Sequence, residues 1–379
     1  ISIPLYAIQS KGISLPISIS YHASGIKVMD QASSVGLGWS LNSGGSITRI
    51  KQGIYDERPN GFYNIVFPDP QDPDYENRMK ALYTGMNMDD LNKMDGQPDI
   101  FYYNFGGKSG KFMFKNRTAK GLPPEILTFP YVPLKITFLD DWKTIQVVDE
   151  DGTLYVFGKS LQGVDYRELS TWGSPGPSNQ DGYPYPSTWH LVNIVSANKA
   201  NAVTLKYDFG YSSYMYNTSN SINEEYNPNL GGNSSLIGSY FSQSQTPSTT
   251  TCKLLTEILF TDGKLVFSYS TTPGTNIRQL DDIKVFNQKG LIKSFGFFYS
   301  KFKNNGIAVT EKNALRLDSC VEINANGVRL SPFNFSYSSF NNYEVPTYNE
   351  LQPESEDLWG YFNNSKIKNR LLVRSASIP

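Results

Sequence analysis

The sequence contains few of the residues that usually carry out chemistry. Its 379 residues include two cysteines and two histidines, and 18% of them are charged. Cys252 and Cys320 are too few for a disulfide framework and lack the spacing of a metal site. We expect two separate thiols in a β core, with a single disulfide as the alternative. A Ser-His-Asp triad would need His22 or His190, but neither accompanies a Gly-x-Ser-x-Gly segment. Both histidines are therefore expected to be structural, with a ring nitrogen bonded to the backbone.

Long apolar runs and a strong excess of charge are also missing. No apolar run approaches the roughly 20 residues of a membrane-spanning helix, and no signal-peptide pattern is present. The formal net charge of −1 gives no field that would draw the chain to nucleic acid or to an anionic membrane. We expect no nucleic-acid partner and no direct membrane insertion. The chain begins at Ile1 without Met, and we expect it to be a piece of a longer polypeptide.

Aromatic residues are abundant, at 14%, and they recur in a repeated phrase. An alternating apolar strand is followed by a tight polar turn and a second strand rich in aromatics. Period-2 alternation sorts side chains onto two faces, so each phrase is typical of a β-hairpin. The five copies are Ile145 to Gly158, Leu191 to Asp208, Leu255 to Ser270, Ile283 to Ser300 and Val321 to Ser338.

The turns of these phrases fit the hairpin interpretation. Four copies have a glycine that can take the positive φ of a tight turn, namely Gly152, Gly263, Gly290 and Gly327. The second copy must use residues 198–201, because asparagine tolerates the left-handed region. The sequence therefore predicts an almost all-β chain of antiparallel hairpins that form twisted sheets, a sandwich or a partial shell.

The chain divides into an opening region, residues 1–115, and a hairpin array, residues 116–379. The opening region contains the glycine-rich segment GLGWSL around Trp39. Two insertions in the array, residues 170–186 and 211–251, are expected to be long loops. The only helix-like spacing lies in residues 76–94, where one face collects Met79, Leu82, Tyr83 and Met86.

The opening region carries a specific set of short motifs. They are Ile3-Pro4, Leu15-Pro16 with Ser20-Tyr21, Gly36 to Leu41 (GLGWSL), and Ile47-Thr48-Arg49. This set resembles the pre-repeat region of Rhs/YD-repeat proteins from Bacteroidota. It is more distantly similar to the N-terminal region of the salmonella virulence plasmid B protein and of the Tc toxin B component. DGQPDIFYYNFGGKSGKF, DEDGTLYVFG and LWGYFN extend the first likeness over most of the chain, whereas the toxin likeness covers roughly residues 1–60.

The resemblance implies a secreted or cell-surface protein, associated with the outer membrane and exported by the type IX secretion system. In the family this region precedes YD repeats, which coil into a hollow β-shell that can enclose a C-terminal toxin or effector. The repeats are not evident here, because Tyr207-Asp208 lacks the following Gly-Arg. The implied partners are the rest of the same polypeptide, with its shell and effector, and outer-membrane export or gliding-motility proteins.

Four residues of the opening region are predicted to be structural: Gly36, Gly38, Trp39 and Arg49. The glycines let backbone segments approach closely, and Trp39 is expected to plug the first sheet. Arg49 is the one charge in this apolar signature, so we expect it to hold a carboxylate or backbone carbonyls. No catalytic, cofactor-binding or metal-ligating residue is predicted.

Two other kinds of site stay open at this point. Trp172, in STWGSPG, and Trp359, in LWGYFN, could stack on sugar rings, although packing beneath loops is the favoured interpretation. Loop carboxylates could bind Ca²⁺, although a solvated loop is favoured for both clusters. These clusters are Asp69, Asp72, Asp74 and Glu76, and then Asp89, Asp90 and Asp95.

The sequence and the resemblance together favour a non-catalytic structural part of a large secreted protein. It would start or plug a β-shell that serves surface display or effector packaging. The first alternative is a carbohydrate- or surface-binding adhesin module used in gliding or attachment. The second is an extracellular hydrolase, which would need convergent carboxylates at a separation that a sequence does not reveal.

Overall fold

The computed structural model is built almost entirely of antiparallel β-strands. It describes residues 1–23, 25, 27, 30–85, 95–117, 123–172, 184–227, 235–271, 278–304, 307–308 and 315–338. The all-β prediction is confirmed, with α1 (Tyr75–Gly85) and the 3-10 turn η1 (Phe62–Asn64) as the helical elements of the described residues. Met79 and Leu82 of α1 pack against the core, as predicted. Residues 86–94 of the expected helix lie outside the described residues.

The N-terminal strands form a separate three-stranded sheet. β1 (Ser2–Ser10), β2 (Ile13–Tyr21) and β3 (Trp39–Asn42) pair in that order. Strict alternation in β2 buries Ile13, Leu15, Ile17 and Ile19 on one face. Pro16 is tolerated because β3 pairs with β2 only from Ser18 to Tyr21, so the missing N–H interrupts no ladder on that side.

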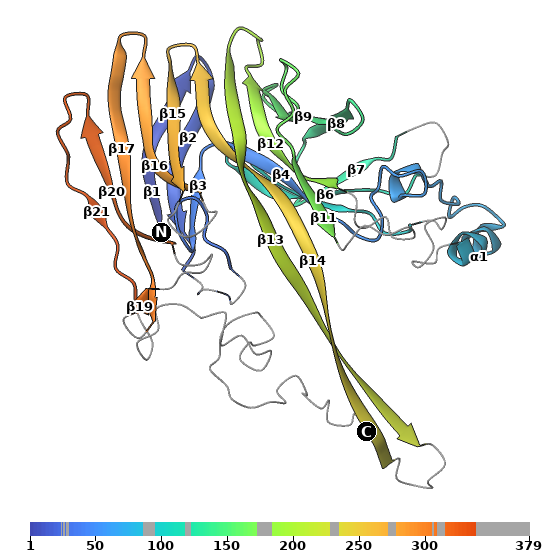
Figure 1. Ribbon diagram of the computed structural model, residues 1–379. Helices are drawn as coiled ribbons and strands as arrows, with labels where there is room; N and C mark the ends of the chain where they lie inside the picture. The colour runs from blue at the N-terminus through green and yellow to red at the C-terminus, as the bar shows by residue number, and fades with distance from the viewer. Residues whose placement is uncertain are drawn as a thin grey trace.

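The hairpin array forms most of a sixteen-stranded sheet. Seven strands follow one another in chain order, and each pairs with the next. They are β13 (Ala202–Asn227), β14 (Ser235–Phe260), β15 (Gly263–Thr271), β16 (Arg278–Asn287), β17 (Gly290–Lys301), β20 (Leu315–Asn324) and β21 (Phe333–Asn334). The short pair β18 (Lys303–Asn304) and β19 (Ile307–Ala308) lies between β17 and β20 in the chain. Figure 1 shows this series side by side.

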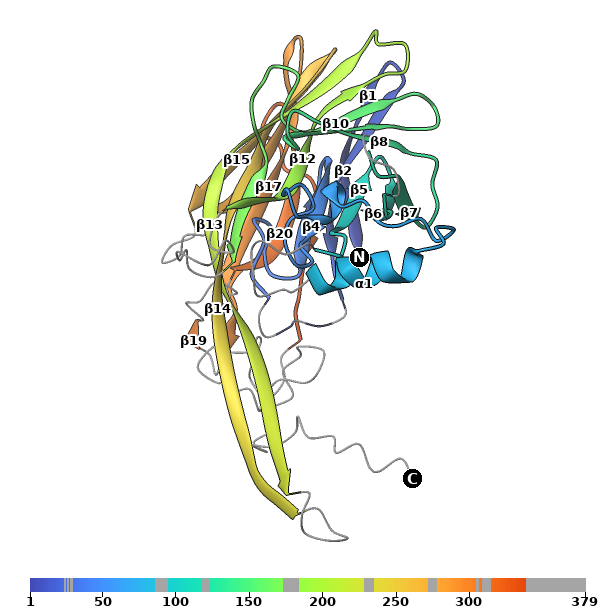
Figure 2. The same ribbon diagram turned by 90° about the vertical axis from the view of Figure 1, so that its right-hand side faces the viewer.

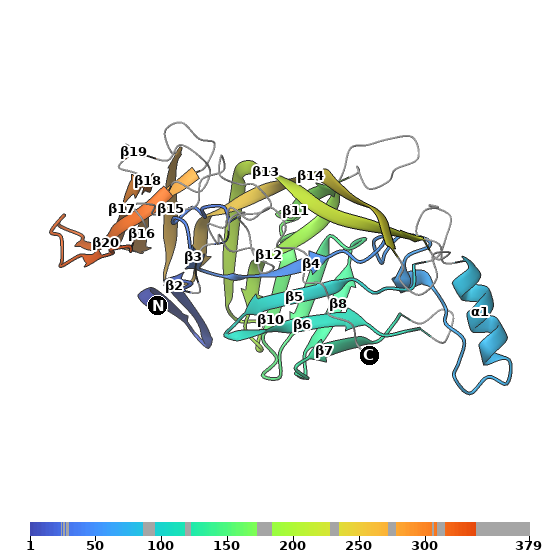
Figure 3. The same cartoon turned by 90° about the horizontal axis from the view of Figure 1, so that it is seen from below.

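The large sheet branches at β12 (Tyr185–Val195). Residues 188–190 of β12 pair with β4 (Gly45–Ile50), which leads through β5 (Ile100–Phe105) and β6 (Lys108–Phe114) to β7 (Ile126–Phe129). Residues 191–195 pair with β10 (Leu154–Gly158), which leads through β9 (Thr144–Val148) to β8 (Lys135–Leu139). Figure 3 shows α1 at the far end of the molecule from β20.

Side chains from the two branches meet in an aromatic core. Phe138 of the β8 branch contacts Phe101 and Phe114 of the β4 branch, with ring centroids 5.6 and 5.4 Å apart. The two predicted regions therefore share one sheet and one core. β6 ends at Phe114, and the next strand, β7, pairs with it in the same sheet.

All five predicted hairpins are present, but two turns form differently from the prediction. Gly152, Gly290 and Gly327 have positive φ, as expected. Gly263 does not: it is needed because a Cβ at this position would lie 2.0 Å from the carbonyl oxygen of Phe286 on the neighbouring strand. In the second copy, Lys199 takes the positive φ of 57° rather than either asparagine.

The two expected loop insertions are partly strand. Residues 168–172 form β11, which pairs with both β12 and β14. Residues 211–227 and 235–251 continue β13 and β14 as one long hairpin, which leaves the body of the molecule in Figures 1 and 2. The prediction was wrong because polar Ser, Thr and Asn hide the period-2 alternation, although Thr and Tyr favour strands.

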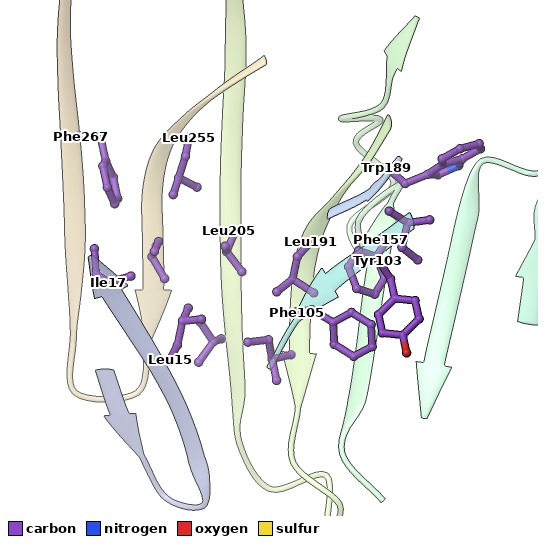
Figure 4. Packing of buried hydrophobic residues seen from close by; sticks show 14 of the residues in the cluster. Leu15, Ile17, Tyr103, Phe105, Phe157, Trp189, Leu191, Leu205, Leu255 and Phe267 are labelled. Carbon is purple, nitrogen blue, oxygen red and sulfur yellow. The ribbon is translucent and has the colours of Figure 1, made fainter. Parts of the chain in front are cut away.

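The first sheet covers the hairpin array as a second layer. Leu15 and Ile17 of β2 face Leu255 and Phe267 of the large sheet (Figure 4), and all four belong to one buried cluster. Polar contacts seal the rim of this layer, since Ser10 Oγ donates to Thr261 Oγ1 at 3.2 Å. The opening region is therefore packed onto the array rather than tethered beside it.

Candidate functional site

The glycine-rich segment of the opening region docks on the far end of the hairpin array. The backbone N–H of Leu37 donates to the carbonyl oxygen of Leu315, the first residue of β20, at 2.9 Å. Leu37 is buried in a small cluster with Leu315 and Phe302. The Ser33 hydroxyl donates a hydrogen bond to the carbonyl oxygen of Trp39 at 2.7 Å, which stabilises the loop. Residues 33–39 thus join the start of the chain to a strand nearly 300 residues later.

Gly36 and Gly38 allow this docking for two reasons. Both have positive φ, at 106° and 77°, which side chains other than glycine rarely adopt. Both also stand against other groups: a Cβ on Gly38 would lie 2.7 Å from the Tyr21 ring, and one on Gly36 would lie 3.1 Å from the Leu317 nitrogen.

Trp39 is the centre of the docked segment. It is 4% exposed, and its ring lies 5.2 Å from that of Tyr21 and 4.5 Å from that of Phe335. Trp39 Nε1 donates to Tyr337 Oη at 2.8 Å, and Tyr337 Oη donates to the Leu317 carbonyl oxygen at 2.7 Å. We name Gly36, Gly38, Trp39, Phe335 and Tyr337 the clamp. It fastens β3 to the last strands of the array.

Replacing Gly38 with alanine is expected to destabilise the protein more than replacing Gly12 with alanine. Both glycines have positive φ, so the backbone strain is similar, but no atom lies within 4 Å of a Cβ on Gly12. The difference should be about 1–3 kcal/mol, the usual cost of forcing extra volume into a packed site. Chemical denaturation of the two variants measures this difference. Equal losses of stability would show that the Tyr21 ring moves aside at no cost.

The second site is a buried charge cluster around Arg49 of β4. Arg49 Nε donates to Asp99 Oδ2 at 2.7 Å, and both side chains are fully buried. The other end of the guanidinium forms a bidentate pair with Glu57. Aromatic rings surround the guanidinium at 5.5–6.0 Å, from Tyr55, Phe101, Trp142 and Trp189. Arg49 therefore contacts two carboxylates, where a carboxylate or backbone carbonyls were expected.

Buried carboxylates fasten the segment after β4 to the segment before β5. Asp99 accepts from the backbone N–H of Gln52 at 2.7 Å and of Asp56 at 3.2 Å. Asp56 in return accepts from the N–H of Asp99 at 3.1 Å. Asp95 accepts from the N–H of Ile54 at 2.8 Å. These hydrogen bonds from backbone N–H groups to carboxyl oxygens hold the two segments together where no strand pairing does.

The cluster contains more acid than base. Burial opposes the charged form of Arg49, but Asp99 and Glu57 outweigh it and raise the pKa of the guanidinium above its ordinary value. Burial raises the pKa of Asp99, while Arg49 acts against that rise. Burial, reinforced by the Asp99 charge, raises the pKa of Asp56 to about 8. Burial and the Asp99 charge therefore both favour the protonated form of Asp56.

Because of Asp56, stability is expected to fall as pH rises from about 4 to 8. In this window the folded protein keeps a proton that the unfolded chain releases, so the loss is up to about 1.4 kcal/mol per pH unit. Asp56→Asn retains an oxygen acceptor for the Asp99 N–H but cannot ionise, and it should flatten this slope. Denaturation curves at several pH values test this, and an unchanged slope in Asp56→Asn would contradict it.

The ring of His190 bonds differently from the expectation. His190 Nε2 lies 2.9 Å from Glu168 Oε1, a carboxylate rather than a backbone group, and its ring stacks on Tyr207 with centroids 4.8 Å apart. The ring of His22 is exposed, and the backbone N–H of His22 donates to the Gly38 carbonyl oxygen.

The two cysteines are separate free thiols, as expected. Burial raises the pKa of Cys252 to about 11 and of Cys320 to about 12. Reactive cysteines have lowered pKa values, so burial acts against nucleophilic reactivity at both thiols.

The structure describes only part of the sequence-predicted aromatic and acidic sites. The Trp172 backbone ends β11 opposite Ser248, and Trp359 lies outside the described residues. Asp72 pairs with Arg78, and Asp69 caps a turn through the Gln71 N–H. Within the described ranges, no group of three or more potential ligands could hold a metal ion. Asp89 and Asp90 lie outside those ranges, and Asp95 is buried rather than solvated.

The acidic half of the charge cluster was not predicted from the sequence. Asp56 and Glu57 belong to no motif, and Asp99, although part of DGQPDIFYYNFGGKSGKF, lies 50 residues from Arg49. The one available signal was a lone carboxylate directly before the strand IFYYNF. A charge adjoining such an apolar strand is costly to bury unless it has a partner.

No protein-family model matches the chain, and no curated protein matches it significantly. None of the helices in the described residues is long and apolar enough to cross a membrane.

Proposed function

We propose that this chain is the non-catalytic, structural opening part of a large secreted, cell-surface protein of the Rhs/YD-repeat type. In that role it starts a β-shell used for surface display or effector packaging, and type IX secretion exports it. The observation that carries the proposal is the strand order of the large sheet. Successive hairpins from β13 to β21 add strands in chain order, and β21 is the last described strand at that edge.

The edge itself supports continued growth. Residues 328–335 use one side to pair with β20, through the Leu330 N–H to Glu322 and the Phe335 N–H to Asp318, both at 2.8 Å. On the other side, no strand of the described part of the chain pairs with them. Val328, Leu330 and Phe333 are 56%, 51% and 55% exposed. An apolar open edge invites further strands, and native proteins normally cover it.

The clamp supports the same role. It fixes the first sheet to the strands next to the open edge, so the edge is held in place by residues that arrive early in the chain. The Asp56 carboxyl group, whose pKa is raised to about 8, is fully buried. Its lack of exposure suits a structural rather than a catalytic task.

Purification of the native protein from its cell envelope tests the proposal. Mass spectrometry should identify this chain as the N-terminal part of a longer polypeptide. A cleaved C-terminal fragment retained with it would support a closed shell with cargo, and co-purified export or motility proteins would support surface display. Recovery from the cytosol, with no further β-repeat sequence attached, would contradict the proposal.

A further inference from the structure

The outer part of the β13–β14 hairpin is a two-stranded ribbon, which we name the arm (residues 214–227 and 235–247). Within this hairpin, β13 pairs with β14 without a register shift from Tyr211 to Glu225. At its base, β12 pairs with residues 202–204 of β13, while β11 and β15 pair with residues 248–250 and 257–260 of β14. Beyond these contacts, the strands of the arm pair only with each other among the described strands. Figures 1 and 2 show the arm well away from the body.

A lone ribbon of this length needs a neighbour. An isolated two-stranded hairpin is marginally stable in water, and three or more strands are needed for independent stability. The two edges of the arm are not equivalent. The β14 edge contains Pro247, which has no N–H to donate, and β11 occupies the positions that follow it. The β13 edge from Ser212 to Asn227 has no proline, lysine or arginine, the devices that usually protect an edge.

The composition of the arm indicates which partner fits. Residues 211–250 contain no Lys, Arg, His or Asp, and their only charges are Glu224 and Glu225. This gives no attraction to nucleic acid, anionic lipid or an acidic protein. The β13 segment 211–223 is uncharged and can lie against an identical segment without repulsion.

We propose that two copies of this chain pair through the β13 edges of their arms, antiparallel, about a two-fold axis at Thr218. This register places Tyr214 opposite Ile222, an aromatic and β-branched pair that stabilises antiparallel strands. It also places Glu224 opposite Ser212, so like charges do not meet. The two ribbons become one four-stranded sheet, which exceeds the three strands needed for independent stability.

Mass measurement by light scattering tests the dimer, with three variants of the full 379-residue chain. The wild type should have the mass of two chains of 42.5 kDa each. Thr218→Lys puts two positive charges opposite each other at the axis and should give the single-chain mass. Gln245→Lys adds the same charge to the residue paired with Thr218, but on the other strand, and should remain dimeric. Mixing Thr218→Lys with Thr218→Glu should restore the double mass.

Two outcomes would overturn the inference. A wild type with single-chain mass at about 100 μM would show that the edge does not pair with itself in any useful range. Equal loss of dimer in Thr218→Lys and Gln245→Lys would place the contact on a face or on the other edge. Far-UV circular dichroism of each variant tests whether the body stays folded, because the substituted positions lie in the arm.

Discussion

Replacing Trp39 with alanine is expected to lower the free energy of unfolding by about 3–5 kcal/mol, the usual cost of deleting a large core aromatic. Trp39 is 4% exposed and contacts Tyr21 of the first sheet and Phe335 beside the open edge. Its loss removes packing from both layers together. Chemical denaturation of wild type and Trp39→Ala measures the change.

Two milder variants separate packing from hydrogen bonding at the clamp. Trp39→Phe keeps much of the ring contact but removes the Nε1–H that donates to Tyr337, so it should cost less than Trp39→Ala. Tyr337→Phe removes the hydroxyl between Trp39 and the Leu317 carbonyl oxygen, at a cost of about 1–3 kcal/mol if both groups stay buried. An unchanged melting temperature in Trp39→Ala would show that the tryptophan does not join the layers.

Replacing Arg49 with methionine is expected to cost about 3–5 kcal/mol, because it leaves Asp99 buried without its cationic partner. Methionine occupies similar volume among the surrounding aromatic rings, so the loss reports mainly on charge. Adding Asp99→Asn and Glu57→Gln to Arg49→Met should recover part of the stability, since the triple variant has no uncompensated carboxylate at this position.

Lys115→Met is the matched control for the charge cluster. Lys115 pairs with Glu125 at 3.1 Å, but both side chains are more than half exposed. An exposed pair contributes about 0–1 kcal/mol, so this variant should be near wild type in denaturation. Similar losses of unfolding free energy in Lys115→Met and Arg49→Met would mean that the buried Arg49–Asp99 pair contributes no more to stability than an exposed pair.

Local patterns predicted the strands well and their long-range arrangement poorly. Alternation and turn residues identified all five hairpins, because both signals lie within about 18 residues of sequence. The branch at β12 had no such signal: Thr188 pairs with Thr48 and with Glu168, and only the packed aromatic core decides between possible neighbours. The long strands of the arm were missed because their residues are polar on both faces over much of their length.

The same limit applies to the sites. Trp39 and Arg49 stood out as a large aromatic between glycines and as a lone charge in an apolar motif. Their partners could not be found in this way. Tyr337 lies 298 residues from Trp39, and Asp99 lies 50 residues from Arg49, so tertiary packing alone brings them together.

Hydrogen exchange at residues 328–335 tests the central claim most directly. The backbone amides on the open side of this segment should exchange rapidly in the 379-residue chain, because no described strand covers them. In the native full-length protein the same amides should be strongly protected by the next strand of the shell. Equal, rapid exchange in both would show that the sheet ends here, and the proposal that this chain starts a β-shell would be wrong.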